Sequence, residues 1–142
     1  MSARPPTRSR WHRAFPELKR DTGAVIGALK RGLPADRVDA LTQALGVPTS
    51  RLADVLSIPT STLSRRRRAG RLDRDESERA YRLARLVDRA AEVFGSVENG
   101  VDWLKRPQFG LGGQPPLSYA DTEPGARAVE DLLGRIEHGI PA

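Results

Sequence analysis

Hydrophobic residues recur at three- and four-residue spacing along most of the chain, which is the period of an amphipathic α-helix. The longest such stretch begins after Asp73 and ends at Gly95, and its apolar stripe consists of Ala80, Leu83, Ala84, Val87, Ala90, Ala91 and Phe94. Asp73 and Glu76 have the spacing of a capping box, in which two groups of the first turn satisfy each other. The pattern therefore predicts one long helix, the strongest in the chain.

Shorter stretches with the same period predict further helices on either side. Their apolar faces lie within residues 25–29, 38–45, 52–56, 97–104 and 126–136. Glycine and proline interrupt the pattern between them, at Gly32, Pro34, Gly46, Pro107 and through the loop 108–119. No segment shows the alternation of a half-buried strand, so we expect an all-α fold.

Residues 51–56 and 60–68 are two short helical segments joined by a tight turn, with arginines on the second. This pattern predicts a DNA-binding helix-turn-helix, with Leu63 anchoring the second segment and Ile58 packed at the turn. Hydroxyl groups on such a helix bind phosphates or base edges, and arginine binds guanine or phosphate. The DNA contacts we expect are Thr60, Ser61, Thr62, Ser64, Arg65, Arg66 and Arg68.

The four consecutive arginines at 65–68 span slightly more than one helical turn, so they cannot all face one surface. We expect some to bind flanking phosphates and one to pack its aliphatic stem over the core. The alternative is a solvated basic helix end favoured by the helix dipole. That effect is worth only about 0.3–1 kcal/mol and does not require four arginines.

Charge is distributed unevenly along the chain. Residues 1–72 contain 15 basic and 5 acidic side chains, a net charge of +10, whereas residues 73–142 contain 9 and 13, a net charge of −4. An arginine-rich genome would explain why only three of the basic residues are lysines, but not why the acids gather in the second half. We therefore expect a polyanion such as nucleic acid as the partner of the first half.

The composition excludes several classes of site. The chain has 142 residues, no cysteine and two histidines, His12 and His138, which lie near its ends. Disulfides, thiolate metal sites and cysteine nucleophiles are excluded, and we expect no metal and no cofactor. No apolar run reaches the about 18–20 residues of a membrane span, and the start lacks the apolar block of a secretory signal. We therefore expect a soluble, cytoplasmic protein.

The first twenty residues combine six basic residues, three prolines and one acid, without a helical or alternating period. This composition predicts a flexible basic arm over residues 1–21. Three roles stay open for it: a solvated tail, which is the simplest, an arm that follows nucleic acid, or an organelle transit peptide.

Three stretches of the second half resemble the C-terminal part of the Xre/MbcA/ParS antitoxins, the partners of RES-domain toxins. They are LDRDESERAYRLARLVDRAAEVFG (72–95), VDWLKRP (101–107) and LGGQPPLSYADTEPGARAVEDLLGRIEHG (111–139). Residues 24–71 are similar to the Xre-like helix-turn-helix of the same family, including TLSRRRRAGRL at 62–72. Single pieces would be weak signals, but their order is specific.

The resemblance implies an all-α protein with an N-terminal helix-turn-helix bundle, a DNA-binding domain at 22–89, followed by a small helical toxin-binding domain at 90–142. It implies a homodimer that binds palindromic operator double-stranded DNA and regulates its own transcription, and that forms a higher-order complex with the toxin. It also implies direct binding that blocks the active site of a NAD-degrading RES-domain toxin. The resemblance implies no catalysis by the chain itself.

The toxin contacts that we expect in the second half are Trp103, Arg127, Asp131, Arg135 and His138. Trp103 is explained more simply as a core residue that clamps the following loop, although tryptophan is enriched among interface hot spots. The glycines at 112–113 lack the spacing and the lysine of a phosphate-binding loop, so we expect a rigid connector there.

Two other functions stay open on the sequence alone. A free-standing helix-turn-helix regulator would also bind DNA in a salt-sensitive way, and it would use the acidic half to dimerise. An enzyme is disfavoured, because Asp75, Glu76 and Glu78 cluster at a helix start, where they complement the helix dipole. No nucleophile–base pair is visible in the sequence.

Overall fold

The computed structural model describes residues 5–140, so residues 1–4 of the predicted arm and residues 141–142 of the predicted toxin-binding domain lie outside the described residues. The described part consists of α1 (Arg8–Ala14), the 3₁₀ turn η1 (Pro16–Lys19), α2 (Thr22–Arg31), α3 (Arg37–Leu45), α4 (Thr49–Leu56), α5 (Thr60–Ala69), α6 (Arg74–Phe94), α7 (Val97–Lys105), the 3₁₀ turn η2 (Phe109–Leu111), α8 (Pro116–Tyr119) and α9 (Glu123–Glu137). The all-α prediction is confirmed. None of these helices is long and apolar enough to cross a membrane.

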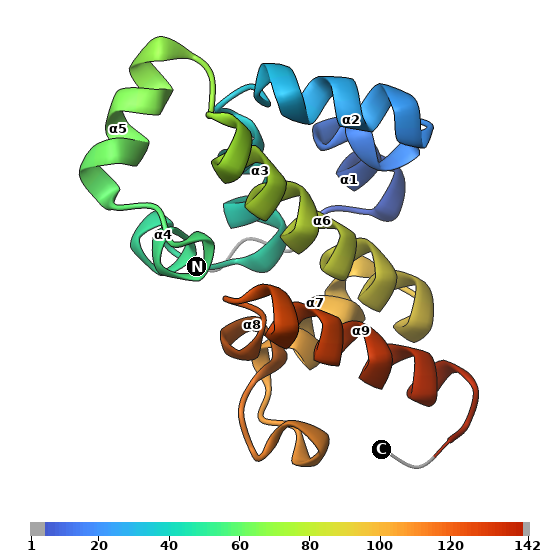
Figure 1. Cartoon of the computed structure of the whole chain (residues 1–142). Helices are drawn as coiled ribbons and strands as arrows, with labels where there is room; N and C mark the ends of the chain where they lie inside the picture. Colours follow the sequence, from blue (N-terminus) through green and yellow to red (C-terminus); the bar gives the residue numbers. More distant parts are fainter. Residues whose placement is uncertain (1–4, 141–142) are drawn as a thin grey trace.

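Helix α6 forms the centre of the molecule. Helices α1 to α5 lie on one side of it, and α7 to α9 lie on the other (Figure 1). The predicted capping box closes its first turn: Asp73 Oδ1 accepts a hydrogen bond from the Glu76 N–H at 2.8 Å, and Glu76 Oε1 accepts one from the Asp73 N–H at 2.9 Å. The predicted apolar stripe that follows is buried from Ala80 to Ala91.

A single hydrophobic core joins the two halves of the molecule. The buried cluster extends from Trp11 in α1 to Leu133 in α9. Helix α7 packs so closely on α6 that a Cβ atom added at Gly100 would lie 2.6 Å from the Ala91 backbone nitrogen. The predicted boundary between residues 89 and 90 falls inside α6. The two halves therefore share a helix and are not separated by a linker.

The N-terminal segment is folded from residue 8, although the sequence predicts a flexible arm over residues 1–21. Trp11 and Phe15 are fully buried, and their ring centroids lie 5.7 Å apart. Thr7 caps α1, because its Oγ1 accepts a hydrogen bond from the Arg10 N–H at 3.3 Å. Two buried aromatic rings remove a large apolar area from water, which offsets the basic, proline-rich composition of the segment.

Charged groups also tie this segment to the helices around it. Arg37 of α3 donates to Glu17 through Nε and Nη2, at 2.8 and 3.1 Å. Burial alone would raise the pKa of Glu17. The hydrogen bonds and charge of Arg37, a backbone hydrogen bond and the charge of Arg20 together outweigh burial and hold this pKa below its ordinary value. His12 Nε2 lies 2.6 Å from Asp88 Oδ1 on α6. The segment is therefore part of the folded core.

Candidate functional site

Helices α4 and α5 meet in a three-residue turn, as the sequence predicts. Ser57 has a φ of 55° and is the one non-glycine residue with a left-handed backbone between residues 5 and 140. The N–H groups of Ser57 and Ile58 donate back to the carbonyls of Asp54 and Ala53, at 3.1 and 2.9 Å. Ile58 is buried, and Pro59 precedes the first turn of α5. This arrangement is a helix-turn-helix.

Helix α5 stands at the edge of the molecule (Figure 1). Leu63 is its one buried residue and links it to the core, as predicted. Thr62 is half-buried, and its Oγ1 accepts a hydrogen bond from Arg65 Nη2 at 3.3 Å. The exposed residues of α5 include most of the predicted DNA contacts: Thr60, Ser61, Ser64, Arg65 and Arg68.

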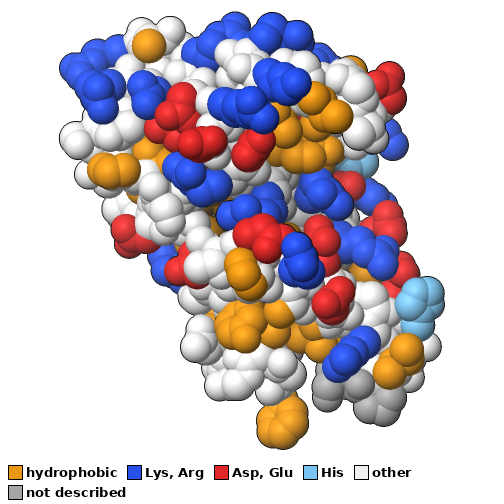
Figure 2. Space-filling view, viewed as in Figure 1, with side chains coloured by type: hydrophobic (Ala, Val, Ile, Leu, Met, Phe, Trp, Pro, Cys, Tyr) orange, Lys and Arg blue, Asp and Glu red, His pale blue; other side chains and the backbone are white. Residues whose placement is uncertain are grey.

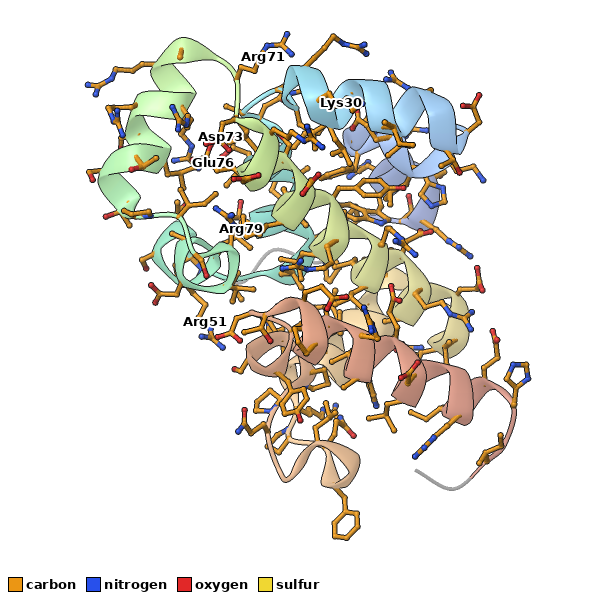
Figure 3. All side chains as sticks on the ribbon, in the orientation of Figure 1. Lys30, Arg51, Arg71, Asp73, Glu76 and Arg79 are labelled. Atoms are coloured by element: carbon orange, nitrogen blue, oxygen red, sulfur yellow. The ribbon has the colours of Figure 1, made fainter. Side chains whose placement is uncertain are left out.

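Arg66, which the sequence predicts to contact DNA, is half-buried and pairs with two acids in the structure. Its Nε donates to Glu76 Oε1 at 2.8 Å, and its Nη2 donates to Asp73 Oδ2 at 3.3 Å. Both acids lie at the start of α6, facing α5 (Figure 3). The hydrogen bond to Glu76 raises the pKa of Arg66. Because Glu76 is buried, its carboxylate needs this counter-charge, and Arg66 therefore braces α5 against α6.

Arg67 is also held by the fold, because its Nη2 donates to Asp39 Oδ1 of α3 at 2.6 Å. Arg65 and Arg68 remain exposed and form no ion pair with any residue between 5 and 140. Lys and Arg side chains gather along the top and upper left of the molecule, over α2 and α5 (Figure 2). Lys30 and Arg71, both exposed, extend this basic surface beyond α5 (Figure 3).

Four of the five predicted toxin contacts lie along α9 and just beyond its end. They are spaced by three or four residues, which places them on one face, and all four are exposed: Arg127, Asp131, Arg135 and His138. Arg127 Nη2 pairs with Glu123 Oε1 one turn earlier, at 2.7 Å. The helix therefore presents a mixed-charge stripe to solvent.

Trp103 does not belong to this stripe. It is half-buried in α7, and its ring lies against Phe94 with the centroids 5.4 Å apart. Its backbone carbonyl accepts a hydrogen bond from Gln108 Nε2 at 3.1 Å. These contacts agree with the structural interpretation, in which Trp103 clamps the following loop.

Comparison with known proteins gives two matches that together cover most of the chain. Residues 24–85 match the antitoxin Xre-like helix-turn-helix domain, and residues 89–139 match the antitoxin Xre/MbcA/ParS C-terminal toxin-binding domain. The chain is 35% identical over 136 residues to Antitoxin Xre of Yersinia enterocolitica, covering 94% of this chain and 91% of that protein. The chain belongs to the Xre antitoxin family. The two family matches adjoin inside α6, so the DNA-binding and toxin-binding parts of this antitoxin share that helix.

Two further relatives cover somewhat less of the antitoxin. Antitoxin Xre of Photorhabdus laumondii is 39% identical over 114 residues, covering 79% of this chain and 77% of that protein. The Prs ADP-ribosylating antitoxin of a Sphingobium species is 29% identical over 124 residues, covering 80% of this chain and 78% of that protein. All three of these relatives are named as antitoxins.

The sequence reasoning did not single out Phe109, the first residue of η2. Its side chain is 95% exposed, far more than the other large hydrophobic residues on the described surface. The one available signal was a phenylalanine next to the glycines of a loop that is rich in glycine and proline. Loop residues have no periodicity that would assign an exposed or buried side, so the signal was not decisive.

Proposed function

We propose that this antitoxin acts in the cytoplasm, where it neutralises a RES-domain, NAD-degrading toxin by direct binding that covers the toxin's active site. We propose further that it binds operator DNA as a homodimer and thereby regulates its own transcription, without catalysis of its own. The observation that carries the proposal is the arrangement of α5. This helix displays three exposed hydroxyl side chains and two exposed arginines that form no ion pair within residues 5–140, at the end of the molecule away from the η2 loop (Figure 1).

The exposed face of α5 supports the DNA-binding part of the proposal. Hydroxyls at Thr60, Ser61 and Ser64 lie in the first two turns, where a recognition helix meets base edges and phosphates. Arg65 and Arg68 lie three residues apart and so share a face. Each guanidinium can bind guanine or phosphate through two hydrogen bonds. Arg66 and Arg67 hold the helix in place while Arg65 and Arg68 make the contacts.

The match of residues 89–139 to a toxin-binding domain supports the second part. The stripe formed by Arg127, Asp131, Arg135 and His138 is exposed and carries both signs of charge. Polar groups of this kind suit the rim of an interface with a pocket that holds the anionic phosphates of NAD. Their contact with the toxin, and that of Trp103, remain predictions.

The DNA-binding part is tested by the double substitution Arg65→Ala/Arg68→Ala, measured on the antitoxin's own promoter at several salt concentrations. We expect binding to weaken at least about 30-fold, because each of the two lost arginine contacts is worth about 1–3 kcal/mol. We also expect a shallower dependence of affinity on salt. Arg106→Ala, which removes the same charge from α7, is the matched control and should bind normally. Unchanged binding by the double variant would refute the assignment of α5 as the recognition helix.

The toxin-binding part is tested by mixing the purified antitoxin with the RES-domain toxin encoded beside it. We expect the two proteins to co-purify and NAD consumption by the toxin to stop at a fixed ratio. The Arg65→Ala/Arg68→Ala variant should inhibit the toxin as well as the unaltered chain does. If the toxin neither binds nor loses activity, the toxin part of the proposal is wrong, whatever the DNA result.

A further inference from the structure

Phe109 is a hydrophobic side chain for which the fold provides no cover. It is 95% exposed, whereas the other two exposed large hydrophobic residues in the described chain, Ile26 and Ile140, are 47% and 54% exposed. A phenylalanine ring in water gives up the stabilisation that burial would bring. A single exposed apolar residue is ordinary on protein surfaces, so the exposure requires a second observation to carry meaning.

The second observation is the rigidity of the loop that holds the ring. An antiparallel bridge joins Gln108 and Gln114, with the Gln108 N–H donating to the Gln114 carbonyl at 3.1 Å and the Gly113 N–H donating to the Gln108 carbonyl at 2.9 Å. Gly112 and Gly113 have φ values of 65° and 82°, which glycine adopts without strain. Leu111 is buried and anchors the turn. The ring is therefore held outward on a braced loop, which lowers the entropic cost of binding.

The third observation is a groove that adjoins the turn carrying the ring. It has a volume of about 490 Å³, and it is lined by Phe94, Asn99, Asp102, Trp103, Arg106, Pro107 and Gln108. Gln108 forms part of both features, because it lines the groove and begins the turn that carries Phe109. Its side chain is pinned by the carbonyls of Trp103 and Arg106, at 3.1 and 3.2 Å. The lining of the groove combines aromatic and charged side chains. Protein–protein interfaces commonly have an apolar centre and a polar rim.

We propose that Phe109 is the hydrophobic anchor of the toxin interface, inserting into an apolar pocket on the toxin while the adjoining groove receives toxin side chains. This inference rests on the proposed toxin-binding function. The toxin is favoured as the occupant because Phe109 and the whole groove lie inside the match to a toxin-binding domain. DNA is an unsuitable occupant, because the loop lies at the opposite end of the molecule from α5 (Figure 1).

The proposal moves the centre of the interface to the α7–α8 connection. The sequence-based prediction places four of its five toxin contacts on α9 and just beyond it, all of them polar or charged: Arg127, Asp131, Arg135 and His138. The fifth, Trp103, lines the groove described above. Exposed charges at an interface rim contribute mainly to association rate and specificity, whereas aromatic residues in desolvated pockets contribute most of the affinity. Phe109 should therefore matter more for toxin affinity than any single residue of the α9 stripe.

The test compares Phe109→Ala with the unaltered antitoxin for binding to the RES-domain toxin by calorimetry. We expect affinity to fall at least about 30-fold, the loss typical of a central hot spot. The melting temperature and promoter binding should not change, because the ring touches little of the antitoxin. Phe109→Tyr keeps the ring and should retain affinity within about threefold. Ile26→Ala removes an exposed hydrophobic residue from α2 and is the matched control.

Each alternative has a distinct result. Toxin affinity of Phe109→Ala within threefold of the unaltered chain would overturn the anchor while leaving the toxin-binding function intact. If Phe109→Ala changes the oligomeric state in size-exclusion chromatography but not toxin affinity, the ring contacts a second copy, and the proposal is wrong. If the unaltered antitoxin does not bind the toxin, the proposed function fails and the anchor fails with it.

Discussion

The two ends of this antitoxin use charged side chains differently. Around α5, arginines reach carboxylates on other helices, as Arg66 does at Glu76 and Arg67 at Asp39, over 10 and 28 residues of sequence. At the surface of α7 and α9, Arg106 pairs with Asp102 and Arg127 with Glu123, each about one turn away in the sequence. The end of α9 is the exception, because Glu137 accepts hydrogen bonds from Arg89 of α6. Pairs between helices hold those helices together, whereas pairs within one helix lie on its exposed surface and connect no second element.

This difference shows how a functional surface can be recognised in each half. Among the four arginines of α5, the informative ones are those that form no ion pair with the described residues, Arg65 and Arg68. In the toxin-binding half, exposed charges are ordinary, and the informative residue is the uncovered aromatic Phe109. A partner is indicated in both halves by a side chain that has no internal use.

The largest effect should come from Trp11→Ala, which tests whether the N-terminal helix belongs to the DNA-binding half. Trp11 is fully buried, so its truncation leaves a cavity and should lower the free energy of unfolding by about 3–5 kcal/mol. Urea denaturation measures this change. Phe109→Ala, the exposed aromatic of the other half, should cost less than about 0.5 kcal/mol. A loss below about 1 kcal/mol for Trp11→Ala would restore the flexible arm that the sequence predicts.

A smaller effect is expected from Glu76→Ala, which removes the carboxylate that receives Arg66 and completes the capping box. Hydrogen bonds to charged groups are worth about 1.5–3 kcal/mol, so the unfolding free energy should fall by about 2 kcal/mol. Asp102→Ala breaks the one-turn pair with Arg106 on α7 and should cost at most about 0.5 kcal/mol. Equal losses for the two variants would erase the contrast between the halves.

The helices could be predicted from the sequence because burial follows the helical period. The stripe from Ala80 to Phe94, the capping box at Asp73 and the turn at Ser57 are all local patterns, and the structure contains each of them. Helix α1 was missed because the basic, proline-rich composition of residues 1–20 indicated a flexible arm, although Trp11, Ala14 and Phe15 have the three- and four-residue spacing of a helix. Its stability comes from Trp11 and Phe15 packing against distant helices, which composition does not reveal.

The functional surfaces were predicted less completely, for a related reason. Four consecutive arginines look alike in sequence. Arg66 differs from its neighbours only because the start of α6, with Asp73 and Glu76, lies beside it in the folded chain. The sequence did not indicate which of the four is held by the fold, and the structure pairs both Arg66 and Arg67 with acids of other helices. Phe109 lies in a loop, where no periodicity separates an exposed ring from a buried one. Three-dimensional position was therefore needed at each of these sites.

Lowering the pH should reduce the free energy of unfolding through protonation of Glu17. Its pKa is lowered in the folded state, so its ion pair with Arg37 contributes stability above the ordinary value of 4.5, and this contribution is lost as the pH falls through the folded pKa. The difference in unfolding free energy between the unaltered chain and Glu17→Gln should therefore be present at neutral pH and shrink below about pH 4.5. Glu123→Gln, on the exposed pair of α9, should give a difference near zero throughout. A difference for Glu17→Gln that does not change with pH would show that the pair contributes through packing alone.

The smallest effect is expected where the two halves touch through Arg51. This residue of α4 donates from Nη2 to Ser118 Oγ of α8 at 2.6 Å, and it reaches across the boundary between the halves (Figure 3). Because Arg51 is exposed, a double-mutant cycle of Arg51→Ala and Ser118→Ala should give a coupling of about 0.5 kcal/mol in unfolding free energy. The DNA affinity of each single variant, measured on the same promoter, separates two roles for Arg51. If its role is to join the halves, both variants should bind DNA alike, since each breaks the same contact. If Arg51→Ala alone weakens binding and flattens the salt dependence, then Arg51 binds phosphate itself, and the DNA surface extends from α5 onto the first turn of α4.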